Sequence, residues 1–418
     1  MKKILFLLSG LALSFSLASC QMDNSSTSST ATTNPTTTDN VSQIEYSVEI
    51  VDFDGTILGS KEITTTNNKS LFDDLKTNFN VKYSESQYGP FISEINSSLV
   101  DPNYSLMLYQ NGTMASTGVD GIILNDNDEI KFVNECWNTE LDEVDKMVDK
   151  VIYSFMKDAD DFLSAEYSDF YLLGAINKMM ELGYSSMNLD FLSDTYLETI
   201  KNKDLNTVNS SNLLGHAILL KSSNTPLDTL KAHIESTKVD VVGGPYGIYS
   251  NIPYYLGAKM AGATIINESE YKESFKASLE TEIGDSGAFL MHVLPTLDGV
   301  SSDLKDKFIA NQVKTFTEDG VKFDEWSSMG VSAGCQIRGF AAIGENIRDE
   351  KYQVNGVDMV EAVLKYLVND YEFKVNLTDT EANNSFATPQ ILAGLMAYKM
   401  SRDLKNTDGS FKAVDIFA

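Results

Sequence analysis

The run Asp158-Ala-Asp160-Asp161 is the arrangement of acids in this sequence that most resembles a catalytic motif. A carboxyl group that donates a proton in catalysis needs an apolar cavity, because burial raises its pKa. Here the acids follow Lys157 and precede Phe162-Leu-Ser-Ala-Glu166, with other charges close by. The surroundings therefore favour a solvated helix start over a catalytic acid.

Nucleophiles and metal ligands show no matching arrangement. The three histidines lack the spacing of metal ligands, and no Ser/His/Asp or Cys/His set can be assigned from spacing. Cys335 lies on an apolar stripe where a buried thiol is expected. Asp52-x-Asp54-Gly55 resembles the start of a calcium loop, but the later ligands are missing, and a turn explains it better. We expect no enzyme activity, no metal site and no required cofactor.

The first twenty residues indicate where the protein is located. Lys2 and Lys3 precede an apolar run from Ile4 to Leu17 that is too short for a stable membrane span. The following Leu17-Ala-Ser-Cys20 resembles a bacterial lipoprotein signal. That resemblance implies cleavage before Cys20 and diacylglycerol on its sulfur, and so an outward-facing protein anchored to the cell membrane. A plain secretory peptide with an incidental cysteine is the alternative.

Composition limits the partners. Residues 21–42 are rich in Ser, Thr and Asn, which predicts a disordered tether that lifts the folded part off the membrane. The chain has 60 acidic and 32 basic residues, a net charge of -28, which disfavours nucleic acid and anionic lipid surfaces as partners.

The length of the chain favours two domains. Cys136 and Cys335 fall in different expected domains, so we expect two buried thiols and no disulfide.

Residues 43–138 are expected to form the first domain. Alternating apolar residues from Ile44 to Ile50, the Gly55 turn and Ile57-Leu58 predict a hairpin. Ser70 then caps a short amphipathic helix. Turn signals at Asn111-Gly112 and around residues 125–128 predict further hairpins, and the whole order is β-grasp-like.

This domain resembles the carboxy-terminal β-domain of transcobalamin and intrinsic factor. The likeness lies in Tyr104-Ser-Leu-Met-Leu-Tyr109-Gln-Asn-Gly112, in residues 116–132 and in the stretch from Tyr88 to Ile92. The family often has Trp after the tyrosine, whereas this chain has Ser105. The resemblance implies a small ligand, with cobalamin or another corrinoid as the leading candidate, and Ser105 puts an aromatic ligand platform in doubt.

Residues 143–418 are expected to be all-helical. Five apolar helices carry small-residue stripes, for example Leu172-Leu-Gly-Ala-Ile176 and Ile391-Leu-Ala-Gly-Leu395, and glycine inside a helix indicates close helix approach. About a dozen helices in pairs predict a closed or curved array. Asp-Gly-x-Phe-like turns and Phe386-Ala-Thr-Pro-Gln390 resemble the α/α-toroid superfamily, which holds terpene cyclases, prenyltransferases and the cobalamin carriers. The fold class is thus α+β, a β-grasp-like domain followed by an (α/α)6-toroid-like domain.

The ligand would lie between the two domains, held by aromatic side chains without covalent chemistry. The candidate residues are Tyr88, Tyr104 and Tyr109 on the β side and Tyr246, Tyr249, Asp285, Phe289, Phe323 and Trp326 on the helical turns. For each aromatic residue alone, core packing is the competing explanation. A membrane transporter is a further expected partner.

Two other functions stay open at this point. The protein could be a cell-surface adhesion module that docks protein or glycan. It could also be a degenerate toroid enzyme that uses Asp160, because Asp158-x-Asp160-Asp161 matches the acidic motif of class II terpene cyclases.

Overall fold

The structure is a computed structural model that describes residues 41–87, 89–164, 170–184, 194–244 and 246–418. Cys20, most of the expected tether and Tyr88 lie outside these residues. Within them no helix is both long and apolar enough to cross a lipid bilayer.

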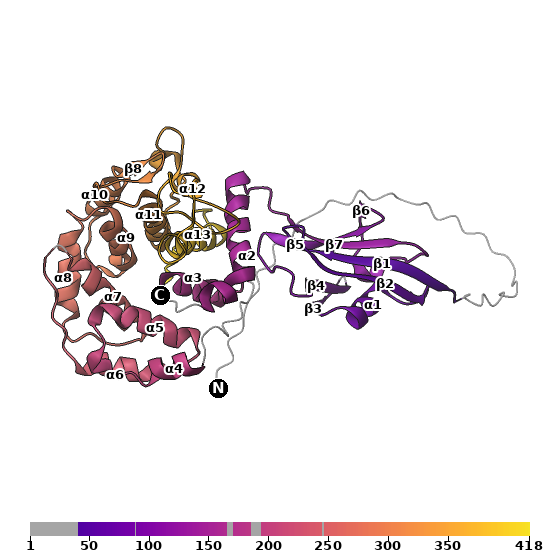
Figure 1. Ribbon diagram of the computed structural model, residues 1–418, viewed down its shortest axis with the longest axis horizontal. Helices are drawn as coiled ribbons and strands as arrows, with labels where there is room; N and C mark the ends of the chain where they lie inside the picture. The colour runs from indigo at the N-terminus through magenta and orange to yellow at the C-terminus, as the bar shows by residue number, and fades with distance from the viewer. Residues whose placement is uncertain (1–40, 88, 165–169, 185–193, 245) are drawn as a thin grey trace, which may run out of the picture. The chain divides into compact units, whose positions relative to one another are not determined.

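The first part of the folded chain is a sheet domain. Its main sheet has the strand order β2-β1-β7-β5-β6, in which β1 and β7 run parallel and the other neighbours run antiparallel. Figure 1 shows this sheet with α1 beside it. The elements are β1 (Gln43–Val51), β2 (Ile57–Thr66), α1 (Leu71–Asn78), β3 (Val81–Ser86), β4 (Gly89–Ile95), β5 (Tyr104–Gln110), β6 (Thr113–Met114), η1 (Val119–Gly121) and β7 (Glu129–Cys136).

Alternation in the strands decides which face of the sheet is covered. Tyr46, Val48 and Ile50 of β1 are buried, and they pack with Leu71 and Leu75 of α1 in one apolar core. Ser70 caps α1 by accepting a hydrogen bond from the Asp73 backbone N–H. The strand residues between the buried ones point to the opposite face, which α1 leaves uncovered.

From Glu143 onward the described chain is largely helical, as expected. The helices are α2 (Glu143–Ser164), α3 (Phe170–Glu181), α4 (Asp194–Lys201), α5 (Leu213–Ser222), α6 (Asp228–Ser236), α7 (Ile248–Met260), α8 (Glu268–Ser278), α9 (Gly284–Val293), α10 (Ser302–Val313), α11 (Met329–Ile343), α12 (Met359–Leu364) and α13 (Ala387–Asp403). Short 3-10 turns and the two-residue strands β8 (Phe316–Thr317) and β9 (Gly320–Val321) connect some of them.

Six of these helices close a ring. The helices α3, α5, α7, α9, α11 and α13 contact one another in that order, and α13 returns to α3. Figure 1 shows α4, α6, α8 and α10 at the periphery of this ring. The alternation of ring helices with peripheral helices is the arrangement that paired helices in a repeat produce.

Glycines let neighbouring ring helices approach closely. A Cβ added to Gly394 of α13 would lie 2.4 Å from the carbonyl oxygen of Gly334 in α11. Likewise, a Cβ on Gly257 of α7 would meet the backbone of α5 at Leu214, 2.8 Å away. The small-residue stripes therefore form helix crossings, as the sequence predicts.

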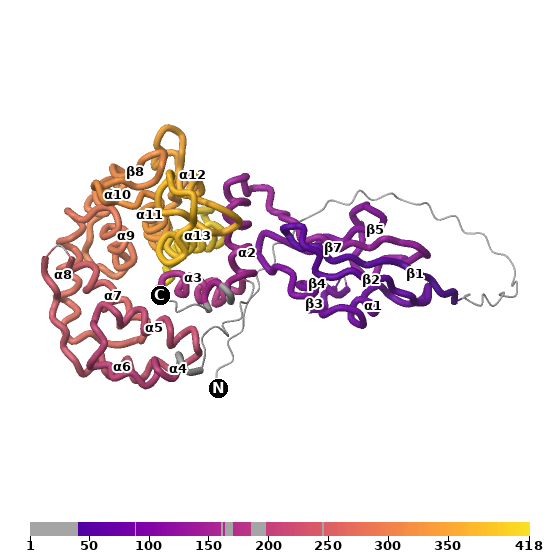
Figure 2. Tube along the Cα trace, viewed as in Figure 1, coloured from indigo at the N-terminus to yellow at the C-terminus, as the bar shows by residue number. Residues whose placement is uncertain are grey.

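The last residues of the chain pack inside the ring. Phe417 is fully buried, and its ring lies 4.7 Å from the imidazole of His292 in α9 and 5.6 Å from the ring of Tyr171 in α3. Lys178 of α3 donates to the carbonyl oxygen of Ala418, and Figure 2 shows the chain end beside α3. The last residues are apolar, and they fill part of the space inside the ring.

Candidate functional site

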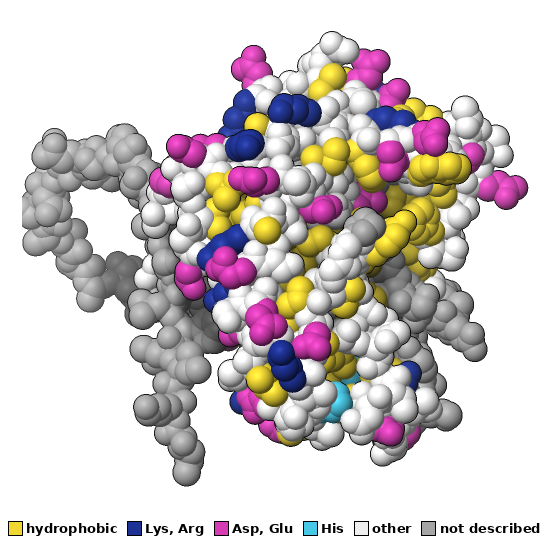
Figure 3. Space-filling model, turned by 90° about the vertical axis from the view of Figure 1, so that its left-hand side faces the viewer, with side chains coloured by type: hydrophobic (Ala, Val, Ile, Leu, Met, Phe, Trp, Pro, Cys, Tyr) yellow, Lys and Arg dark blue, Asp and Glu magenta, His cyan; other side chains and the backbone are white. Residues whose placement is uncertain are grey.

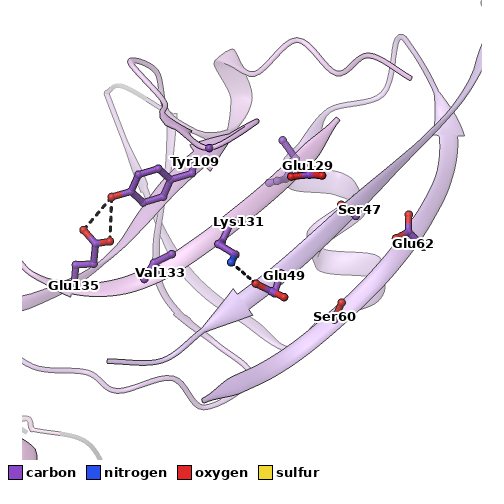
Figure 4. Close-up of a pocket in the computed structure, with 11 residues that line it drawn as sticks. Ser47, Glu49, Ser60, Glu62, Tyr109, Glu129, Lys131, Val133 and Glu135 are labelled. Carbon is purple, nitrogen blue, oxygen red and sulfur yellow. Dashed lines mark hydrogen bonds and ion pairs between the residues drawn. The ribbon is translucent and has the colours of Figure 1, made fainter. Parts of the chain in front are cut away.

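The uncovered face of the main sheet is hollowed. A cavity of about 560 Å³ opens there, and Figure 4 shows side chains from four strands around it. The lining comes from Ser60 and Glu62 of β2, Ser47 and Glu49 of β1, Glu129, Lys131, Val133 and Glu135 of β7, and Tyr109 of β5. We call these residues the sheet hollow.

Strand register brings the central residues of the sheet hollow into one row. Ser60 pairs with Glu49, Glu49 with Lys131, and Lys131 with Tyr109, so the row crosses β2, β1, β7 and β5. Side chains that are directly opposite on one face interact. The Lys131 ammonium accordingly lies 2.5 Å from a Glu49 carboxylate oxygen.

Tyr109 is held at one side of the sheet hollow. Its hydroxyl donates to Glu135, whose two carboxylate oxygens are each 3.0 Å away. The hydrogen bond to Glu135 raises the pKa of Tyr109, because ionising the phenol would leave two anions in contact. The Tyr109 side chain is therefore a neutral phenol that lines one side of the sheet hollow.

The sheet hollow is rich in hydrogen-bond acceptors. Four carboxylates face one ammonium, and within the described residues neither Glu62 nor Glu129 has an ion-pair partner. Carboxylates accept hydrogen bonds and attract cations. The surface can thus bind a ligand that presents N–H or O–H donors.

A second cluster lies where α7, α9 and α11 meet. The rings of Tyr249 and Phe289 are 6.0 Å apart, and the Arg338 guanidinium lies 5.6 Å from Phe289 and 4.4 Å from the Tyr171 ring. Arg338 is fully buried, and its Nε has no hydrogen-bond partner. Its terminal nitrogens donate to the Gln390 side-chain oxygen and to the Cys335 sulfur, and cation–π contacts with the aromatic rings add to these bonds.

Asp285, which begins α9, belongs to this cluster. Burial raises the pKa of Asp285, although a hydrogen bond from Ser332 and the charge of Arg338 oppose the rise. Its Oδ1 atom is buried without a hydrogen-bond partner. Burial also raises the pKa of the neighbouring Tyr249 to about 12.

Asp285→Asn should change how stability depends on pH. A carboxyl whose pKa is raised by folding stabilises the fold at low pH, and this contribution is lost as pH rises above 3.8 through the folded-state pKa. As the pH rises above 3.8, we expect the free energy of unfolding of the variant to increase relative to that of wild type. Urea unfolding at a series of pH values measures this difference. An equal dependence in both proteins would contradict the assignment.

The predicted ligand residues do not form a single site. Tyr109 lines the sheet hollow, and Tyr104 lies at another depression beside β4. Tyr249, Asp285 and Phe289 meet in the helical cluster described above. The remaining helical candidates are Phe323, whose ring covers Gly284, and two exposed residues, Tyr246 at 78% and Trp326 at 84%.

The two acidic motifs of the sequence lie in different surroundings. Asp158 is exposed within α2, six residues before its end, so it does not lie at a helix start. Asp52 and Asp54 both pair with the Lys157 ammonium, at 3.2 and 2.6 Å. Partial burial works against ionisation of Asp54, but the hydrogen bond from Lys157 lowers its pKa. A lysine therefore occupies the place that a calcium loop would give to a cation.

Two further expectations concern cysteine and metal. No disulfide joins Cys136 and Cys335, but only Cys335 is buried, and Cys136 at the end of β7 is half-buried. Among the described residues no three His, Cys, Asp or Glu side chains are grouped to hold a metal ion.

Sequence reasoning missed most of the sheet hollow. Glu49, Lys131 and Glu135 were not candidates, although the alternation Glu129-Ile-Lys-Phe-Val-Asn-Glu135 places its polar residues on one face. Arg338 was missed because nothing in an apolar helix marks one arginine as surrounded by aromatic rings.

Part of the sheet domain matches a known domain family. Residues 68–135, from before α1 into β7, match a domain of unknown function, DUF4430. The structure of a proposed metal-binding protein from Ruminococcus gnavus ATCC 29149 is 19% identical, covers 23% of this chain and 99% of its own, and has a TM-score of 0.20. No curated protein matches the sequence. The DUF4430 match thus covers part of the sheet domain, and a largely helical region follows it in the chain.

Proposed function

We propose that this protein captures a small ligand outside the cell without reacting with it, and that the sheet hollow is where the ligand binds. The observation that carries the proposal is the row Ser60, Glu49, Lys131 and Tyr109 at the bottom of a cavity of about 560 Å³. A concave surface with a few fixed polar groups is the usual form of a small-molecule site.

A corrinoid such as cobalamin is the ligand that we propose. Corrinoids carry carboxamide groups around a planar macrocycle, and their N–H donors complement the carboxylates of Glu62 and Glu129. The Tyr109 ring offers an apolar wall for the macrocycle. The resemblance of Tyr104–Gly112 to the β-domain of cobalamin carriers supports this choice.

The ligand is tested by calorimetric titration of the protein with cyanocobalamin and with dicyanocobinamide. We expect wild type to bind, and Glu62→Gln with Glu129→Gln to weaken binding at least tenfold, because carboxylates accept stronger hydrogen bonds than amides. Glu85→Gln on β3, which removes an exposed carboxylate outside the sheet hollow, is the matched control and should leave binding unchanged. No heat with either ligand at high micromolar concentration would remove the corrinoid assignment.

The proposal places the protein on the outer surface of the cell membrane, with lipid on Cys20 as its anchor and a membrane transporter as the receiver of the ligand. The Leu17-Ala-Ser-Cys20 signal supports the anchor. Cys20→Ser should move the protein from the membrane fraction to the medium and abolish labelling by radioactive palmitate. Retention in the membrane with no label would mean another mode of attachment.

The helical region is proposed to be an α/α-toroid. The cyclic contacts of α3, α5, α7, α9, α11 and α13 support this assignment. The ring would then be a scaffold, because Phe417 packs inside it and aromatic rings surround Arg338.

A further inference from the structure

Part of the outer edge of strand β5 has no hydrogen-bonded strand beside it, although β4 contacts β5. Its neighbour β6 is two residues long and pairs only with Tyr109 and Gln110. The rest of the outer edge of β5, from Tyr104 to Met107, has no strand beside it in the hydrogen-bonded order of the main sheet. An uncovered edge presents backbone groups that another chain can pair with.

The hydrogen-bond pattern identifies the backbone groups that point outward. The N–H of Asn111 donates to Glu129 and the N–H of Trp137 donates to Asn103, so the odd-numbered residues of β5 face β7. Leu106 therefore points its N–H and its carbonyl away from β7. Within the described chain no backbone group pairs with either of them.

Side chains beside this edge form a small depression. A cavity of about 200 Å³ is lined by Phe91 to Ser93 of β4, by Leu99 to Pro102 of the following loop, by Tyr104 to Leu106 of β5 and by Trp137. The side chains of Phe91 and Trp137 are 60% and 53% exposed. Exposed aromatic side chains around a depression are typical of an interaction site.

Charge selects the kind of partner. Residues 43–138 contain 15 acidic residues against five lysines, a net charge of -10, and no arginine. The helical region, residues 139–418, is also acidic, with 43 acidic and 25 basic residues, and Figure 3 shows side chains of both signs on one of its faces. An acidic domain attracts a basic partner and disfavours an acidic one.

We propose that the outer edge of β5 binds an extended basic peptide of another protein by strand addition. Leu106 would exchange two backbone hydrogen bonds with the peptide, and alternate apolar side chains would enter the depression between Phe91 and Trp137. Backbone pairing supplies affinity and side-chain depressions supply selectivity in this mode of recognition. The site is separate from the sheet hollow and does not depend on the corrinoid proposal.

The probe is a fluorescein-labelled peptide of alternating lysine and valine, titrated into the full chain and followed by anisotropy. Its control has three central residues replaced by proline, which keeps the lysines at the ends and removes backbone donors. We expect the alternating peptide to bind at least tenfold more tightly. Equal binding of the two peptides would mean attraction by charge alone and would overturn strand addition.

Leu106→Pro removes the outward N–H of β5 and leaves the ladder to β7 intact, since that ladder uses the odd-numbered residues. We expect at least a tenfold loss of peptide binding, whereas Leu106→Val, which keeps the N–H, should bind as wild type. Phe91→Ser changes an exposed side chain and reports on the same site if the proline variant unfolds. Unchanged binding in folded Leu106→Pro, or in Phe91→Ser if the proline variant does not fold, would overturn the proposal.

Discussion

Replacing Lys399 with methionine is expected to lower the free energy of unfolding by about 3–5 kcal/mol. Lys399 of α13 is fully buried, and its ammonium lies 2.7 Å from Asp101, 3.0 Å from Asp149 and 2.9 Å from Asp403. Methionine fills the volume of the side chain but leaves three buried carboxylates with only Arg402 to pair two of them. Urea unfolding measures the loss.

The matched control for this variant is Lys307→Met. Lys307 is exposed on α10, and surface changes of this kind alter stability by at most about 0.5 kcal/mol. Asp101 precedes β5, whereas the other two carboxylates belong to α2 and α13, so the cluster ties three distant segments. An unfolding midpoint of Lys399→Met equal to that of Lys307→Met would show that the cluster does not hold these segments together.

Gly394→Val is expected to destabilise the ring by about 3 kcal/mol, at the upper end of what overpacking costs. The new Cβ would lie 2.4 Å from the Gly334 carbonyl oxygen and 3.1 Å from its Cα, and backbone atoms cannot turn aside as a side chain can. The helices α11 and α13 would have to separate. Thermal unfolding followed by circular dichroism measures the effect.

Gly243→Val provides the comparison, because a Cβ there meets no atom within 4 Å. It should unfold within about 0.5 kcal/mol of wild type. If the two valine variants were equally stable, the crossing of α11 and α13 would not be as close as the structure has it.

Local signals predicted local structure well. Gly55 and Asn111-Gly112 have the positive φ angles that their turns require, and both turns fall where the sequence places them. Ser70 caps α1 as its spacing to the following acids indicates. In the helical region, repeated glycine predicted close helix approach because only a missing Cβ permits it.

Long-range partners could not be predicted. Lys157 pairs with Asp54 across 103 residues of sequence, and nothing near either residue indicates the other. The position of Phe417 inside the ring depends on where the segment after α13 turns inward, and hydrophobic periodicity does not encode that turn. The sheet hollow was missed for a related reason: alternation shows that Glu49 and Lys131 are polar and outward, but register alone places them side by side.

The ligand-capture account is tested most directly by nuclear magnetic resonance of the amide-labelled full chain with increasing cyanocobalamin. It predicts shifts of the amide signals of Ser47, Glu49, Lys131 and Tyr109 that saturate with ligand, while the signals of Leu106 and its neighbours in β4 stay in place. Unchanged signals across the sheet hollow at high micromolar cyanocobalamin would contradict it.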